Sequence, residues 1–269
     1  MYTAIDFNIS TIIRDKTERF HLNILMQLWV GLQMDATSAQ NIKMKKPGLV
    51  GGISWVSTIE YYKLINEGVN KQLGGLHFGE CIIYSIDFGR LQERGWIEAC
   101  PLLLDACLKL EACGAEGIVL CANTAHLHMK AIRQRISIPV IDIIQSTAVA
   151  IEDQGVKRVG LLGTKFVMES DLYVEGLSRR GVDVLVPESL KVREQIQHTL
   201  KEELGKGIFE ESTKLFYLNV IKELAARGAE AIVMGCTEIP LMISHNDTDI
   251  PLFDTTKIHA EAVVEFMLS

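Results

Sequence analysis

Residues 114–119 read Gly-Ala-Glu-Gly-Ile-Val, and residues 228–233 read Gly-Ala-Glu-Ala-Ile-Val. Each copy is a glycine-led turn followed by an apolar run, which is typical of a turn entering a buried strand. Two further pairs of segments repeat in the same order at nearly the same offset: Gly48–Gly52 with Gly160–Thr164, and Ile138–Asp142 with Ile250–Asp254. Three ordered anchors indicate an internal duplication, so we expect two halves of like fold.

Short apolar runs alternate with longer amphipathic segments from Lys46 onward. The segments between the runs have helical spacing, for example Ile97–Ala112 and Phe216–Ala226. Strands that alternate with helices favour parallel sheets covered on both faces. The fold class is therefore α/β, with two pseudo-symmetric, doubly wound parallel-sheet domains. Strands are expected at Gly48–Gly51, Cys81–Asp87, Gly117–Cys121, Val140–Ile141, Val159–Leu162, Val182–Val186, Ala231–Gly235 and Leu252–Asp254.

The duplication also predicts the domain boundaries. We expect one half at residues 45–146, completed by residues 255–269, and the other half at residues 147–254. Residues 1–44 precede the first repeat and are expected to be a poorly ordered or surface-docked extension. Because ligands bind beyond the carboxyl ends of the strands in open parallel sheets, the two halves should face one shared cleft.

Composition limits the classes of partner. The chain has 27 basic and 34 acidic side chains and a formal net charge of −7, which disfavours nucleic acid and membrane as partners. A local cleft can still bind a small anion. The six cysteines form no CxxC pair, which is typical of a reducing compartment, so we expect a cytoplasmic protein. Four of them are expected to be packed thiols without a chemical role: Cys81, Cys100, Cys107 and Cys113.

The other two cysteines, Cys121 and Cys236, each follow a Gly-Ala-Glu-x-Ile-Val strand and precede a probable helix. The partial positive charge of a helix N-terminus stabilises a thiolate, so we expect both thiol pKa values to be lowered. Thr124 and Thr237 follow the cysteines, and the plain structural interpretation of these two residues is helix capping.

Two thiols at matched points of one cleft suggest an acid and a base on opposite faces of a carbon atom. Such a pair inverts the centre by two-base proton transfer and needs no cofactor if positioned donors stabilise the carbanion. Near-attack contacts on both sides place the sulfur atoms about 7 Å apart. We expect single Cys121→Ser or Cys236→Ser substitutions to lower the rate by at least about 10²-fold.

The glycine turns have two interpretations. Gly51-Gly52-Ile53-Ser54 could bind phosphate, but it lacks the spacing of dinucleotide and P-loop motifs. A substrate carboxylate held by backbone N–H groups and Ser54 fits better. Thr164 occupies the matching turn of the second half, and Asn123 and Thr124 could complete this carboxylate site.

Three histidines carry weaker alternatives. His126 and His128 are spaced i, i+2, which does not suit a metal site, so we expect no metal. A Cys121–His126 nucleophilic couple is conceivable. His259 on the last helix is more often a packed residue, although it could orient Cys236 or Glu238.

Four motifs resemble the aspartate/glutamate racemase family, and within it the broad-specificity amino-acid racemases: Gly51–Tyr62, Leu120–Thr124, Gly235–Leu241 and Asp254–Glu261. The resemblance implies two pseudo-symmetric α/β domains, a homodimer, a small-molecule amino-acid substrate and no cofactor. It also implies Cys121 and Cys236 as the catalytic pair. The substrate contacts that it implies are Ile53, Ser54, Asn123, Thr124, Thr164 and Thr237.

We therefore predict a cofactor-independent amino-acid racemase, an isomerase that inverts the α-carbon by two-base 1,1-proton transfer. Relatives specific for aspartate are expected to hold its side chain with basic groups, but Tyr173–Leu177 contains none, and only Arg90 or Arg94 could serve. Two alternatives are a non-catalytic two-lobed binder of small carboxylates and a sister enzyme, such as a hydantoin racemase or a dicarboxylate isomerase or decarboxylase.

Overall fold

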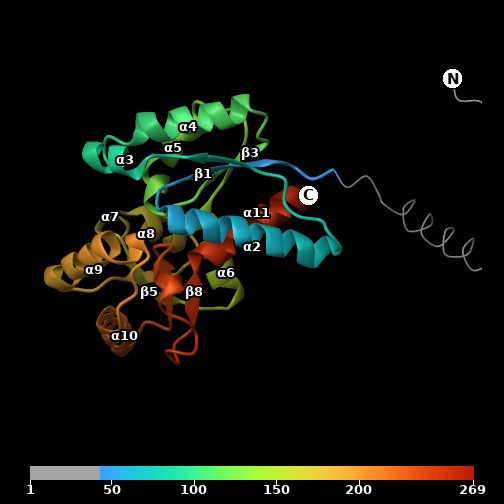
Figure 1. Ribbon diagram of the computed structural model, residues 1–269. Helices are drawn as coiled ribbons and strands as arrows, with labels where there is room; N and C mark the ends of the chain where they lie inside the picture. The colour runs from blue at the N-terminus through green and yellow to red at the C-terminus, as the bar shows by residue number, and fades with distance from the viewer. Residues whose placement is uncertain (1–42) are drawn as a thin grey trace, which may run out of the picture. The chain divides into compact units, whose positions relative to one another are not determined.

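The structure is a computed structural model that describes residues 43–269. The expectation for the N-terminal extension concerns residues that lie, apart from the last two, outside this range. The described chain forms two four-stranded parallel sheets flanked by helices (Figure 1). Every strand expected from the sequence is present, which confirms the α/β class and the architecture of two similar parallel sheets.

The first sheet has the strand order β2-β1-β3-β4. Its strands are β1 (Pro47–Gly51), β2 (Ile82–Ser85), β3 (Gly117–Leu120) and β4 (Val140–Ile141). The second sheet has the matching order β6-β5-β7-β8. Its strands are β5 (Arg158–Gly163), β6 (Asp183–Leu185), β7 (Ala231–Gly235) and β8 (Leu252–Asp254).

Helices connect the strands in both sheets. Around the first sheet these are α2 (Trp55–Leu73), α3 (Phe88–Arg94), α4 (Cys100–Ala112), the 3-10 helix η2 (Thr124–His128) and α5 (Met129–Arg133). Between β4 and β7 the chain forms α6 (Ile143–Asp153), α7 (Lys165–Glu169), α8 (Leu172–Ser178), α9 (Leu190–Glu202), η3 (Leu204–Lys206) and α10 (Glu211–Ala226). After β7 come η4 (Ile239–Leu241) and α11 (Thr255–Leu268).

The repeated Gly-Ala-Glu motif has the same structural role in both sheets. The Glu116 carboxylate accepts a hydrogen bond from the backbone N–H of Lys46 at 2.8 Å, and the Glu230 carboxylate accepts one from Lys157 at 2.8 Å. Each bond ties the turn before a central strand to the start of its neighbour. Because the glycine that opens each motif has a positive φ, a side chain there would strain the turn.

The repeated aspartates begin matched helices that cross between the sheets. Asp142 caps α6 and Asp254 caps α11, each with one carboxylate oxygen accepting from two backbone N–H groups. Helix α6 packs into the core of the second sheet, whereas α11 packs into the core of the first. We call β1–β4 with α2–α5 and α11 the first lobe, and β5–β8 with α6–α10 the second lobe.

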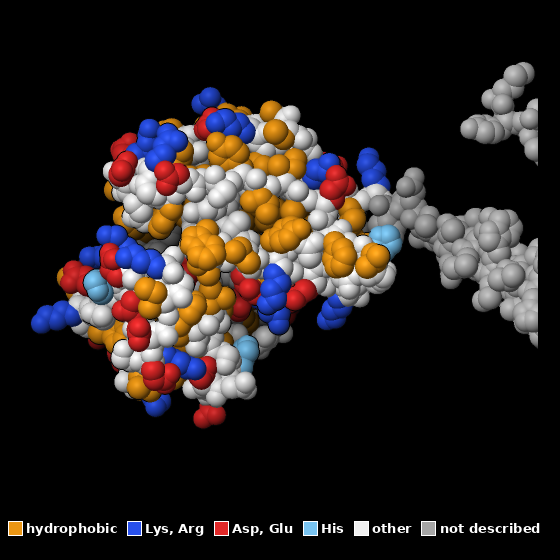
Figure 2. Space-filling model, viewed as in Figure 1, with side chains coloured by type: hydrophobic (Ala, Val, Ile, Leu, Met, Phe, Trp, Pro, Cys, Tyr) orange, Lys and Arg blue, Asp and Glu red, His pale blue; other side chains and the backbone are white. Residues whose placement is uncertain are grey.

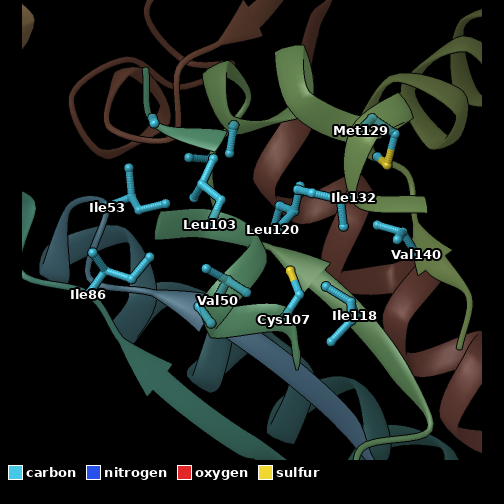
Figure 3. Packing of buried hydrophobic residues seen from close by; sticks show 14 of the residues in the cluster. Val50, Ile53, Ile86, Leu103, Cys107, Ile118, Leu120, Met129, Ile132 and Val140 are labelled. Carbon is cyan, nitrogen blue, oxygen red and sulfur yellow. The ribbon is translucent and has the colours of Figure 1, made fainter. Parts of the chain in front are cut away.

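Strand β3 is buried on both faces, and its side chains alternate between two cores. Ile118 and Leu120 pack with Cys107 of α4 (Figure 3). Val119 and Cys121 lie in the other core, formed with α2 and α11. Such alternation is the period-2 rule of a strand, and it decides where Cys121 points.

The remaining cysteines are partly as expected. Cys107 is buried and Cys81 and Cys100 are half-buried, but Cys113 is exposed where α4 ends. Across residues 43–269, we find no helix with the length and hydrophobicity required to cross a bilayer.

Candidate active site

Residues that follow β1, β3, β5 and β7 line one pocket between the lobes, with a cavity volume of about 60 Å³. The position agrees with the rule that ligands bind beyond the carboxyl ends of parallel strands. Most of the predicted site residues meet here: Ile53, Ser54, Asn123, Thr124, Thr164, Cys236 and Thr237.

Cys236 lies directly after β7 and contributes its thiol to the pocket. Its Sγ donates a hydrogen bond to Oε2 of Glu238 at 2.9 Å. The Glu238 side chain is only 5% exposed, and burial of a carboxylate is costly unless several donors satisfy it. The thiol of Cys236 and the buried carboxylate of Glu238 therefore form a hydrogen-bonded pair in this pocket.

Hydroxyl groups from both lobes complete the surroundings of Glu238. Ser57, in the first turn of α2, donates to Glu238 Oε1 at 2.9 Å and lies 2.6 Å from the Thr237 hydroxyl. Thr237 donates to Glu238 Oε2 at 3.1 Å. The first lobe thus helps to hold the carboxylate that contacts the Cys236 thiol.

Cys121 does not reach the pocket, and the prediction that two thiols face each other there is wrong. The side chain is 1% exposed and packs with Leu49, Tyr61 and Val119 in the core beneath α2 and α11. Its Sγ contacts the carbonyl oxygen of Val119, two residues earlier, at 3.9 Å. The next residue, Ala122, lines the pocket instead.

A one-residue offset explains this difference. Leu120 pairs with Val50 on β1, and Met234 pairs with Leu162 on β5, so the registers of the two sheets match Leu120 with Met234. Cys121 therefore matches Gly235, and Ala122 matches Cys236. A shift of one residue along an extended chain moves a side chain to the opposite face. The Gly-Ala-Glu repeat already has this offset, so the sequence contained the signal.

The expected lowering of the thiol pKa values is also wrong. Burial and the carboxylate of Glu238 raise the pKa of the Cys236 thiol well above its ordinary value. Burial raises the pKa of the Cys121 thiol as well. The helix that follows Cys236, η4, is a single short turn, and a buried carboxylate beside the sulfur outweighs any helix-end effect.

Thr124 and Thr237 do not cap helices. Neither η2 nor η4 has a side-chain cap. The Thr124 hydroxyl instead lies 3.0 Å from the Thr164 hydroxyl, which joins the two lobes across the pocket. Thr164 itself caps α7 by accepting from the backbone N–H of Val167 at 3.2 Å.

The Asn123 side chain is hydrogen-bonded to two side chains that are distant in the sequence. Its amide nitrogen donates to the Thr255 hydroxyl at 3.1 Å, and its amide oxygen accepts from Tyr173 Oη at 2.6 Å. Both partners are buried. The amide is therefore oriented before any ligand binds, an arrangement that sequence reasoning missed because Tyr173 comes from α8 of the other lobe.

The turn after β1 is strained at Ser54, whose φ of 35° is unusual for a residue with a side chain. The preceding Gly52 has a φ of 79°, and a Cβ atom there would approach the Ile86 carbonyl oxygen within 2.2 Å. This close backbone approach presents Ile53 and Ser54 to the pocket. Backbone strain of this kind is found mostly at functional sites.

The histidines are structural. His126 contacts the Ala122 carbonyl oxygen through Nδ1 at 3.0 Å and accepts from the Ile143 backbone N–H. His259 accepts from Tyr61 Oη through Nδ1 and donates through Nε2 to the Ile141 carbonyl oxygen. It therefore does not orient Cys236 or Glu238. Burial lowers the pKa of His126 and lowers that of His259 to about 3, so both rings are neutral at physiological pH.

Larger side chains also line the pocket, namely Phe88, Gln92, Trp96, Gln197 and Lys201. Lys201 of α9 is the single cation among the described residues that line the pocket, and it lies 3.4 Å from Glu202. Arg90 and Arg94 do not line it. Sequence reasoning missed Lys201 because nothing local to α9 indicates that this helix covers the cleft.

Within the described part of the chain, no group of three or more His, Cys, Asp or Glu side chains could hold a metal ion. The chemical groups that the pocket offers are therefore a thiol, a carboxylate, an ammonium group at the rim, and a set of hydroxyls and amides. Such a site can move a proton and bind a carboxylate.

Comparisons with known proteins agree with the fold. A family model described as Asp/Glu/Hydantoin racemase matches residues 50–263. The broad specificity amino-acid racemase RacX of Bacillus subtilis is 26% identical over 227 residues, which cover 82% of this chain and 98% of that protein.

Two solved structures are similar over most of the chain. A Yersinia pestis protein assigned as an Asp/Glu racemase is 43% identical, with a TM-score of 0.76, and the match covers 84% of this chain and 100% of that one. An aspartate racemase homologue from Pyrococcus horikoshii OT3 is 34% identical, with a TM-score of 0.72 and the same coverage.

Proposed function

The chain belongs to the Asp/Glu/Hydantoin racemase family and is an isomerase of the amino-acid racemase type, and from this premise we propose that Cys236 is the group that exchanges a proton with the α-carbon of a small amino acid. One observation carries the proposal, namely the Cys236 thiol in the pocket with its hydrogen bond to buried Glu238. A protein that only binds carboxylates has no use for such a dyad.

Glu238 is the acceptor of the thiol proton. When the proton moves from Cys236 Sγ to the carboxylate, the resulting thiolate can remove the α-proton of the substrate. The Cys236 pKa is raised by burial and by Glu238, so the thiol is protonated at rest and is also able to return a proton to the carbanion. A positioned acid or base of this kind accelerates proton transfer by about 10²–10⁴-fold.

The substrate carboxylate is bound by neutral donors. Asn123 and Thr124 of the first lobe, with Thr164 and Thr237 of the second, surround the pocket, and the turn at Ile53 and Ser54 forms its wall. Donors that are fixed in advance stabilise negative charge without reorganisation. They also stabilise the carbanion, so we propose that no cofactor takes part.

The dimensions of the pocket support a small substrate. A cavity of about 60 Å³ is too small for a nucleotide, so the substrate we propose is a small molecule. Phe88 and Trp96 give one side of the wall an apolar surface, whereas Lys201 adds one positive charge at the rim. We propose that acidic and small polar amino acids are the preferred substrates.

The test is racemisation of single-enantiomer aspartate, glutamate, alanine and serine, followed by chiral chromatography. We expect turnover with at least one of them, unaffected by hydroxylamine, which inactivates pyridoxal enzymes. Cys236→Ser should lower the rate by at least about 10²-fold.

Cys121→Ser is the matched control, since this thiol lies in the core and not in the pocket. Its rate per folded molecule should stay within about threefold of wild type. Equal turnover in wild type and Cys236→Ser, or no turnover with any amino acid, would show that the assignment is wrong.

We also propose a cytoplasmic homodimer. One face of α2 exposes an apolar stripe at helical spacing, with Trp55 61%, Ile59 57% and Tyr62 51% exposed, and hydrophobic side chains gather over this helix in Figure 2. Exposed apolar patches of this kind are typical of subunit interfaces. Sedimentation equilibrium would decide the matter, because a monomer at micromolar concentration contradicts the proposal.

A further inference from the structure

We propose that the active site is one-sided, so that the enzyme exchanges the α-proton of one enantiomer with solvent faster than it inverts that carbon. This inference rests on the proposed function, because it assumes that Cys236 handles the α-proton. The reason is that Ala122 occupies the position at which a second acid or base would face Cys236 across the pocket.

The equivalence of Ala122 and Cys236 follows from the sheet registers. Leu120 and Met234 occupy the same place in their sheets, and each residue of interest lies two positions further along. Both residues line the pocket. A pseudo-symmetric pair of acid–base groups would therefore need a titratable side chain at 122, where this chain has a methyl group.

The titratable groups of the pocket are confined to one lobe. The ionisable side chains among the described residues that line it are Cys236, Glu238 and Lys201, and all three belong to the second lobe. The first lobe contributes side chains that do not titrate: Ile53, Ser54, Phe88, Gln92, Trp96, Ala122, Asn123 and Thr124. The asymmetry is a property of the whole pocket and not of a single position.

Hydroxyl groups do not replace the missing acid. Thr124 is hydrogen-bonded to Thr164, and the Ser54 oxygen accepts from the Ser57 backbone N–H at 3.4 Å. An alcohol is a far weaker acid than a thiol, so protonation of a carbanion by these groups, or by water that they hold, is slow compared with protonation by Cys236.

The proton balance leads to a distinct activity. The Cys236 thiolate takes the α-proton of the enantiomer whose Cα–H bond points toward it, giving a thiol and a carbanion. In heavy water the thiol exchanges to S–D and returns a deuteron to the same face, so the original configuration is recovered with deuterium at Cα. Inversion requires a proton on the Ala122 face and is the slower outcome.

The experiment uses the full chain in heavy water with the separate L and D forms of aspartate, glutamate and alanine. Loss of the α-proton signal by NMR measures exchange, and chiral chromatography measures inversion. We expect one enantiomer of a substrate to exchange at least about ten times faster than it inverts, because a positioned acid contributes about 10²–10⁴-fold and the Ala122 face lacks one. The opposite enantiomer should exchange no faster than it inverts.

Ala122→Cys should supply the missing group and raise inversion at least about tenfold, which brings the ratio of exchange to inversion toward one. Ala122→Ser is the matched control of similar size, and it should raise inversion much less. If Ala122→Cys fails to fold, as judged by circular dichroism, the wild-type ratio alone still decides the question.

The possible outcomes are distinguishable. Equal rates of exchange and inversion for both enantiomers of wild-type substrate would overturn the one-sided site while leaving the racemase proposal intact. No exchange with any amino acid tested, from folded wild-type protein, would overturn the proposed function and this inference together.

Discussion

The first and second lobes have the same strand order, the same capping aspartates and the same glutamate-anchored turns, yet they contribute different groups to the pocket. Positions that build the scaffold are matched, as in Glu116 with Glu230. The matched positions that follow β3 and β7 differ: Ala122 is equivalent to Cys236, and Thr124 is equivalent to Glu238. In this protein both copies of the duplication keep the scaffold, whereas only the second lobe contributes ionisable side chains to the pocket.

A second contrast lies beneath the pocket. The offset of 112 that relates Asp142 to Asp254 also relates Tyr61 to Tyr173 and Thr147 to His259. In the first lobe Tyr61 contacts His259, whereas Tyr173 contacts Asn123 at the pocket wall. One member of the tyrosine pair therefore supports the core, and the other orients the Asn123 amide that lines the pocket.

Substitutions at the matched residues Glu238 and Thr124 should change the kinetic constants most, and they test the contrast between the lobes directly. Glu238→Gln keeps the shape of the side chain but cannot accept the Cys236 proton, so kcat should fall by about 10²-fold. Thr124→Val should mainly raise KM, by about tenfold, because it removes the hydroxyl group that we propose binds the substrate carboxylate. Steady-state kinetics on the best substrate measures both. Equal effects of the two variants on kcat would contradict the division between the lobes.

An intermediate effect concerns the buried His259. Its pKa lies at about 3 in the folded chain against an ordinary 6.5, so between these values the unfolded chain binds a proton that the folded chain does not. The free energy of unfolding therefore does not depend on the protonation of this histidine above pH 6.5. It decreases as the pH falls below that value, by about 2 kcal/mol at pH 5. His126 shifts in the same direction.

Urea unfolding at pH 7.5 and pH 5 measures this loss. His259→Asn should remove its share of the pH dependence, whereas Thr147→Val at the matched position of α6 should leave the pH dependence unchanged. If His259→Asn keeps the full difference between the two pH values, the histidine is not the group that titrates.

The smallest effect is expected at the rim. Lys201 of the second lobe should favour acidic substrates, so Lys201→Ala should raise KM for aspartate or glutamate by about tenfold and leave KM for alanine nearly unchanged. The charge is partly exposed and paired with Glu202, which limits its contribution. Gln92→Ala alters the first-lobe side of the rim and should show no preference for charge. A charge-independent effect of Lys201→Ala would contradict this role.

Most of the fold was predictable from the sequence because its signals are local. Apolar runs such as Ala231–Gly235 are buried on both faces, and capping residues such as Asp254 bond to the next few backbone N–H groups. The site was only partly predictable. Ser54, Asn123, Thr164 and Cys236 were placed correctly beside the cleft, because parallel topology brings the ends of the central strands together.

Cys121 was placed incorrectly because its residue type was given more weight than its register. One residue along an extended chain reverses the direction of the side chain, so a cysteine next to the matched position packs beneath α11 instead of facing Cys236. Glu238 was not predicted to contact Cys236, although it lies only two residues away in the sequence. Its role as a buried hydrogen-bond partner depends on Ser57, which is 181 residues away.

The sequence by itself therefore determined the two α/β lobes, the strand ends that form the pocket and the thiol of Cys236 at one of those ends, because hydrophobic period, turn chemistry and duplication are properties of neighbouring residues. Only the tertiary structure decided that Cys121 is a core residue, that Tyr173 holds Asn123 and that Lys201 covers the rim. Those facts depend on which face of an element meets another lobe, and side-chain direction across a cleft is set by packing between distant segments.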